Sequence, residues 1–174
     1  KALPIWSHMA NENWCMIGYH SVSVLADAVA KGLPLDKEEV LKAMVSSSTI
    51  PYLDGTGEYM EKGYVALDHN GSAASLTLEY AYDDWTIYHT ALLAGNRSVA
   101  DTYKKRAANY TNVFDTNMGY ARPRYADGRW KENFNLLNTH GEGFIEGNAL
   151  NYSFYVPQDV DNMIRLMGGD KSFV

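Results

Sequence analysis

The 174-residue chain is long enough for one domain with a sizeable core, and its 46% apolar and 21% charged residues are typical of a globular protein. Its net charge of -6 argues against a nucleic-acid partner, because phosphate binding needs a basic surface. The single cysteine, Cys15, excludes an internal disulfide, and no apolar run is long enough to span a membrane. Neither an initiator methionine nor a signal peptide opens the sequence, so we expect a fragment of a longer protein.

The N-terminal half of the chain is predicted to be mainly helical. Apolar residues recur on a broad face over residues 15–31, and Gly32 supplies a stop. Asp36 is expected to cap a second helix over residues 37–47, with Glu38 and Glu39 in the first turn, where the helix dipole favours anions. Residues 49–71 are rich in Gly and Tyr and predict a loop, whose length in a compact domain indicates a functional role.

The second half continues the helical pattern. Residues 72–94 form the strongest predicted helix, and Gly95 ends it. Asn96 or Ser98 begins another helix, from residue 99 to 114, so the two form an αα-hairpin. Residues 120–134 are polar and rich in turn residues, which predicts a short hairpin. Two short helices, over residues 146–152 and 158–167, close the chain.

Helix pairs joined by alternating short and long loops predict an all-α fold of the α/α-toroid type. A tetratricopeptide-like array is the alternative layout, but the sequence has no fixed period of about 34 residues. An incomplete ring leaves apolar helix faces uncovered, and large apolar patches drive association. We therefore expect a homo-oligomer or a domain-swapped assembly.

Four segments carry recognisable motifs in order along the chain. They are residues 3–6 with 16–21 (LPIW and MIGYHS), residues 77–85 (TLEYAYDDW), residues 114–115 with 127–128 (FD and DG), and residues 144–149 (FIEGNA) with Tyr152-Ser153, Val156-Pro157, Asp159 and Leu166-Met167-Gly168-Gly169. Together they resemble glycoside hydrolase family 92, the calcium-dependent exo-acting α-mannosidases. A single Glu-Gly-Asn motif is weakly specific, but four motifs in order over nearly the whole chain are strongly so.

The resemblance implies a parent protein in which a β-sandwich packs against an (α/α)6 barrel. Residues 1–174 would then be a single incomplete α/α-barrel catalytic segment, about half of the ring. The family removes terminal α-linked mannose with inversion, assisted by Ca2+ whose ligands fall mostly outside this chain, so metal-binding residues here are unknown. Mannose-containing glycans are the implied partners, and the implied parent is exported to the bacterial periplasm or cell surface.

The resemblance also assigns catalytic roles. The glutamate of the Glu-Gly-Asn motif is the general acid of the family, and here it is Glu146. The base is an aspartate in a Gly-Asn-Asp segment that these residues lack, so the chain alone is expected to be inactive. Two departures from the family pattern bear on the sugar site or on the packing beneath it: Leu150 replaces tryptophan, and Gln158 replaces histidine.

The residues around Glu146 favour the same role on chemical grounds. Phe144 and Ile145 precede it and Glu142 lies nearby, so partial burial and a like charge are expected to keep it protonated near neutral pH, as a general acid requires. Inverting hydrolysis needs a second carboxylate roughly 6.5–9.5 Å away, with room for water between the two. The alternative is that Glu146 is a first-turn glutamate stabilised by the helix dipole.

Four further residues are candidates for substrate binding. Trp14 is suited to stacking on a sugar and Glu12 to binding hydroxyls, although both also suit a helix entrance. His20 has the best claim among five histidines that show no metal-ligand spacing. Asn148 is a candidate for sugar binding or for helix capping, and its amide oxygen, like that of Asn151, also suits calcium.

Asp83 and Asp84 are adjacent in a predicted helix, so their side chains point about 100° apart and do not share one face. We expect structural contacts for them, with a loop or a tyrosine, rather than a catalytic pair. The aromatic loops leave a second function open, which is a non-catalytic all-α scaffold module that binds glycans or proteins.

Overall fold

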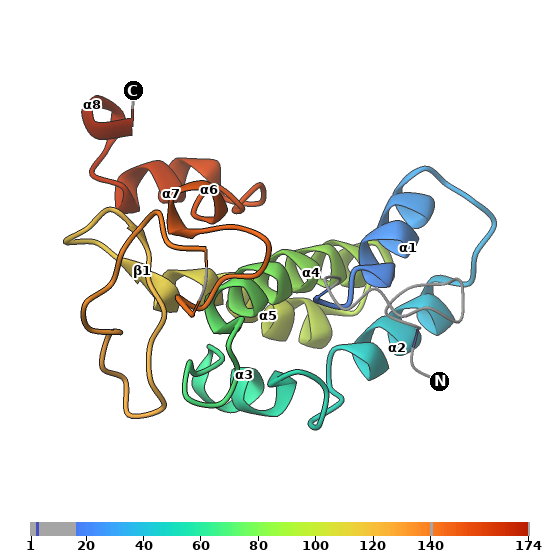
Figure 1. Cartoon of the computed structure of the whole chain (residues 1–174). Coiled ribbons are helices and arrows are strands. Elements are labelled where there is room, and N and C mark those ends of the chain that lie inside the picture. The colour runs from blue at the N-terminus through green and yellow to red at the C-terminus, as the bar shows by residue number, and fades with distance from the viewer. Residues whose placement is uncertain (1–2, 4–16, 140, 174) are drawn as a thin grey trace.

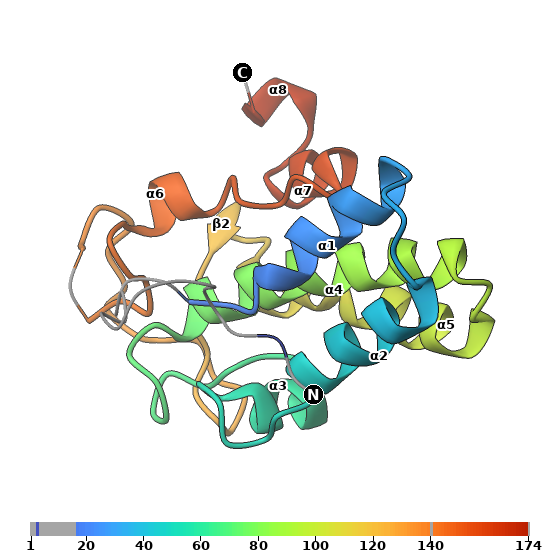
Figure 2. The ribbon, with the colours of Figure 1, turned by 90° about the vertical axis from the view of Figure 1, so that its right-hand side faces the viewer.

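The computed structural model describes residues 3, 17–139 and 141–173. Its helices confirm the prediction of an all-α fold (Figure 1). Helix α4 (Ala73–Leu93) runs through the middle, with α1 (Ser21–Ala30), α2 (Lys37–Ser47) and α5 (Arg97–Arg106) beside it, as Figures 1 and 2 show. It also packs against the 3-10 helix η1 (Asn109–Val113). Because it is apolar on most sides, α4 is buried along most of its length.

The entrances of α1 and α2 differ in how well the sequence predicts them. Asp36 caps α2 by accepting the N–H groups of Glu38 and Glu39, which confirms the predicted cap. Helix α1 begins only at Ser21, so the predicted start at residue 15 is wrong for the described residues 17–20. The reason is Gly18, whose φ of 84° belongs to a left-handed turn, and where an added Cβ would lie 3.0 Å from Asp83 Oδ2.

A short helix interrupts the segment predicted to be one long loop. Helix α3 (Thr56–Lys62) lies between Gly55 and Gly63, which adopt φ values of 76° and 79°. Tyr59 and Thr56 are its buried residues. Seven residues with one buried aromatic side chain give no readable helical period, which explains why the prediction was wrong here.

The rest of the chain follows the prediction with shorter elements. Asn96 caps α5, and Gly95 makes the turn of the predicted αα-hairpin, but α5 ends at Arg106 rather than near residue 114. Strands β1 (Phe114–Asp115) and β2 (Tyr120–Ala121) pair antiparallel, and an isolated bridge joins Arg124 to Trp130 within the predicted hairpin. The C-terminal elements are α6 (Ala149–Tyr152), α7 (Val160–Leu166) and α8 (Asp170–Phe173).

The core has two parts that share α4. One lies between α1, α2, α3, α4 and α5, and the other joins α4 to η1, β1, β2, α6 and α7. The second part holds residues 141–156 against the N-terminal half of α4, which places the Glu-Gly-Asn motif. Within the described residues, no helix is both long and apolar enough to cross a membrane. The expected homo-oligomer stays a prediction.

Candidate active site

Residues 141–148, here called the Glu146 segment, lie over the first turns of α4. The carbonyl oxygen of Gly143 accepts the N–H groups of Ala74 and Ser75 at 2.9 and 3.2 Å, and Ser75 Oγ accepts the Ile145 N–H at 3.2 Å. Amides in the first turn of a helix have no partner within that helix, so the segment supplies one. Gly143 has a φ of 83°, and an added Cβ would lie 2.8 Å from Pro123 Cβ, so this approach requires glycine.

Glu146 occupies a backbone conformation that is rare for its residue type. Its φ is 50°, in the left-handed region that glycine favours and other residues adopt at a cost. The side chain is exposed, and its carboxylate makes no hydrogen bond or ion pair with the described residues. A strained residue with a free carboxylate, held by its neighbours on both sides, is the arrangement found at functional sites.

Two expectations about the surroundings of Glu146 are wrong. The side chain is not partly buried within this chain, and it does not lie in a first helical turn, because α6 begins three residues later at Ala149. Asn148 is the cap of that helix: it accepts the Asn151 N–H at 3.2 Å, and Asn151 Oδ1 accepts the Asn148 N–H at 2.8 Å. This reciprocal pair keeps both amide oxygens occupied, so the structure shows the capping role of Asn148.

Behind the segment lies a group of polar side chains, here called the Glu79 cluster: the buried Glu79 and Asp83 and the partly buried His20, Tyr152 and Tyr155. His20 donates from Nε2 to Glu79 Oε2 at 2.9 Å and from Nδ1 to Asp83 Oδ1 at 2.8 Å. The Tyr152 hydroxyl donates to Glu79 Oε1 at 2.8 Å, and burial and the same carboxylate raise the pKa of Tyr155. Both ring nitrogens of His20 are thus occupied by carboxylates, and the predicted role in substrate binding stays a prediction.

The protonation state of His20 follows from these partners. Burial alone lowers the pKa of an imidazole, but the hydrogen bonds that His20 donates to Asp83 and Glu79 outweigh it and raise the pKa of His20 to about 10. Burial raises the pKa of Asp83, with His20 acting in the opposite direction. His20 is therefore an imidazolium at neutral pH, clamped between two acidic side chains.

This clamp predicts a loss of stability in alkali. The pKa of His20 is about 10 in the folded chain against about 6.5 unfolded, so its contribution is complete below pH 6.5 and disappears as the pH rises toward 10. Urea unfolding of the chain should show a free energy of unfolding lower at pH 9 than at pH 6, by on the order of a few kcal/mol. His20→Gln should lose less over this interval. Equal losses in both proteins, or no loss in the wild type, would refute the clamp.

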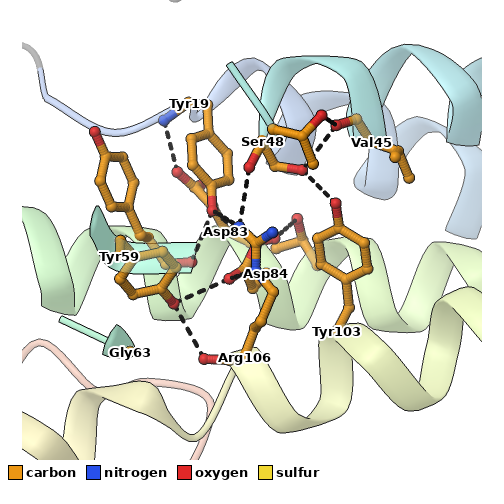
Figure 3. Close-up of polar contacts among 12 residues, drawn as sticks. Tyr19, Val45, Ser48, Tyr59, Gly63, Asp83, Asp84, Tyr103 and Arg106 are labelled. Atoms are coloured by element: carbon orange, nitrogen blue, oxygen red, sulfur yellow. Dashed lines mark hydrogen bonds and ion pairs between the residues drawn. The ribbon is translucent and has the colours of Figure 1, made fainter. Parts of the chain in front are cut away.

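The other aspartate, Asp84, serves a separate structural group (Figure 3). Its carboxylate accepts the hydroxyls of Tyr19 and Tyr59 at 2.7 and 2.9 Å and Arg106 Nε at 2.8 Å. Burial raises the pKa of Asp84 to about 6 against the opposing effects of Arg106 and the two hydroxyls, so the ion pair is charged at neutral pH. Asp83 and Asp84 thus face different partners and hold tyrosines and neighbouring segments, as predicted from their adjacency.

Glu79 was overlooked as a site residue. The sequence does carry a signal for it, since Glu79 and Asp83 are spaced i, i+4 and lie on one helix face, where both reach His20. The adjacent pair Asp83 and Asp84 is the more obvious pattern in this helix, but it is the spacing of Glu79 and Asp83 that forms the cluster.

The candidates Glu12 and Trp14 lie outside the described residues. Within the described residues, no group of three or more His, Cys, Asp or Glu side chains is placed to hold a metal ion.

Comparison with known proteins identifies the family of the chain. Residues 1–174 match the family profile described as the glycosyl hydrolase family 92 catalytic domain. A match of this extent defines a glycosidase catalytic domain as the class. The chain belongs to glycosyl hydrolase family 92.

Several relatives are similar to the chain. A family 92 α-mannosidase from Bacteroides thetaiotaomicron has a TM-score of 0.92 and 39% identity, over 99% of this chain and 23% of that one. The structure of its complex with mannoimidazole has a TM-score of 0.93 and 37% identity, over 99% of this chain and 24% of that one. An inverting family 92 mannosidase from the same bacterium has a TM-score of 0.85 and 33% identity, over 94% of this chain and 23% of that one.

A curated relative, an uncharacterized secreted glycosidase of Arthroderma benhamiae, is 26% identical over 196 residues, which is 90% of this chain and 25% of the relative. The chain therefore spans about a quarter of the length of the relatives it matches.

Proposed function

We propose that this chain is part of an (α/α)6 catalytic domain that removes terminal α-linked mannose with inversion, and that Glu146 is its general acid. The observation that carries the proposal is the backbone of Glu146, which is held in the left-handed region while its exposed carboxylate makes no hydrogen bond or ion pair with the described residues. Membership of family 92 and the mannosidases among the similar structures support the substrate. The inverting mannosidase among them supports the stereochemical course.

In this reaction the carboxylic acid of Glu146 gives its proton to the glycosidic oxygen while the bond from that oxygen to the anomeric carbon breaks. A second carboxylate takes a proton from the water that attacks the opposite face of the same carbon. Residues 1–174 contain no Gly-Asn-Asp segment, so we assign the base to another part of the protein. The same part would cover Glu146, which is exposed in this chain, and so provide the enclosed environment that an acid catalyst needs.

Calcium belongs to the proposal, but the described residues alone do not form a site for it. They contain no cluster of three acidic or histidine side chains, and the amide oxygens of Asn148 and Asn151 are engaged in the cap of α6. Calcium takes six to eight oxygen ligands, so most of these would come from outside this chain. We also propose that the parent is exported, which the name of the secreted fungal relative supports.

The test uses the full-length protein that contains these residues, an aryl α-mannoside and proton NMR of the first sugar released. We expect β-mannose to appear first, loss of turnover with a chelator, and recovery with Ca2+. The isolated chain should give no turnover, because it lacks the base. If α-mannose appears first, the inverting mechanism is wrong. If calorimetry detects mannose binding while the full-length protein gives no turnover, the chain is part of a binding module instead.

A further inference from the structure

We propose that Glu79 is a positioning residue for Glu146, acting through Tyr152 on the backbone of the Glu146 segment. The inference rests on the proposed function only for the role of Glu146 itself. The physical claim is that a buried carboxylate on α4 determines where the exposed carboxylate lies. It follows from contacts that cross from α4, through Tyr152, to both sides of Glu146.

The contacts can be followed residue by residue. Glu79 Oε1 accepts the Tyr152 hydroxyl at 2.8 Å, and the Tyr152 ring packs on the ring of Phe144, with the two centroids 5.9 Å apart. The next residue, Ile145, directly precedes Glu146, and its N–H is accepted by Ser75 Oγ at 3.2 Å. Burial and the Glu79 carboxylate raise the pKa of Tyr152, with Ser75 acting in the opposite direction.

The Tyr152 ring also limits the chain on the other side of Glu146. A Cβ added at Gly147 would lie 3.2 Å from Tyr152 Cδ2 and 3.0 Å from Asn151 Nδ2. The backbone after Glu146 therefore packs closely on the ring whose hydroxyl is bound by Glu79. A left-handed glutamate persists only where its surroundings leave no relaxed alternative, and Tyr152 supplies a contact on each side of it.

Glu79 is itself held in place. His20 binds its second oxygen at 2.9 Å and is anchored by Asp83, which also accepts the Tyr19 N–H at 2.8 Å. The side chain of Glu79 is only 10% exposed. A buried carboxylate with a cationic partner on one oxygen and a tyrosine hydroxyl on the other has little freedom to move, so it is a fixed reference for the segment.

The chain offers a matched pair of variants for the test. Tyr152→Phe and Tyr155→Phe each remove a hydroxyl whose pKa Glu79 raises, but the Tyr152 ring packs on Phe144 and Gly147, whereas the Tyr155 ring packs on Tyr82 and Tyr152. Amide hydrogen exchange by NMR on the 174-residue chain should show Ile145 exchanging roughly five- to tenfold faster in Tyr152→Phe, the loss expected for one hydrogen bond. Tyr155→Phe should leave Ile145 near its wild-type rate. Ser75→Ala, which keeps a good helix former in α4, should reproduce the effect of Tyr152→Phe.

Exchange at Ile87, in the buried second half of α4, reports global stability and serves as the internal reference. If Ile145 is accelerated equally in Tyr152→Phe and Tyr155→Phe, or only as much as Ile87, the positioning role is wrong. This experiment uses no substrate, so its failure leaves the proposed function intact. Conversely, a protein without mannosidase activity can still show the coupling between Tyr152 and Ile145.

Discussion

Arg106→Met should lower the free energy of unfolding by about 3–5 kcal/mol at pH 7, because it leaves the Asp84 carboxylate buried without its cation. The guanidinium also donates to the carbonyl of Ser48 at 3.0 Å and to the Tyr19 hydroxyl at 3.1 Å, and it lies over the ring of Tyr103. One side chain therefore connects α5 to α4, to the end of α2 and to the entrance of α1 (Figure 3). A loss of this size is a large fraction of the stability of a small domain.

The chain contains a matched control for this substitution. Arg129 pairs with Asp127 at the same N–O distance of 2.8 Å, but those side chains are 65% and 53% exposed, so Arg129→Met should cost far less stability than Arg106→Met. Urea unfolding of both variants measures the difference. The Arg106→Met penalty should shrink at pH 5, where Asp84 in the variant is protonated more easily. If the two substitutions cost the same, the buried pair does not organise the helices.

Glu146→Gln should lower kcat of the full-length protein on an α-linked mannose disaccharide by a factor of about 100 to 10,000, the usual contribution of a general acid. Glutamine keeps the shape of the side chain but has no proton to give to the leaving oxygen. KM should change little, because the lost interaction belongs to the transition state.

Glu142→Gln is the control for that experiment. Glu142 lies four residues earlier in the same segment, where it is buried, accepts Asn138 Nδ2 at 3.1 Å and pairs with Lys131 at 3.5 Å. Its substitution should reduce stability while changing kcat far less than Glu146→Gln does. If Glu142→Gln abolishes turnover and Glu146→Gln does not, the assignment of the acid is wrong.

Local chemistry predicted the regular elements of this fold well. The cap at Asp36 depends on residues within one helical turn. The apolar pattern of α4 is predictable because it continues along a single long helix. Helix α3 and the late start of α1 were not predicted. Both depend on left-handed glycines, at Gly55 and Gly18, whose neighbours Val65 and Asp83 come from distant parts of the chain.

In the candidate site, too, local sequence predicts some features, while others depend on contacts between distant parts of the chain. Its motif identified Glu146, but the left-handed backbone of that residue lies between Ile145, whose N–H is bound by Ser75 Oγ, and Gly147, which packs on the Tyr152 ring. Ser75 belongs to α4, far away in the sequence, so this arrangement could not be read from the motif. The Glu79 cluster joins α1, α4 and the segment after Glu146, so only the packed helices bring it together. Calcium and the base stay predictions because they depend on residues beyond these.

The most direct measurement of acid catalysis by Glu146 is the dependence of kcat on the leaving group in the full-length protein and in Glu146→Gln. An aryl mannoside whose phenol is strongly acidic needs no protonation as it departs, whereas a sugar leaving group does. We predict that Glu146→Gln retains most of its activity on the activated mannoside and loses it on a disaccharide. An equal loss on both substrates would contradict the account, because it would mean that this carboxylate does not protonate the departing oxygen.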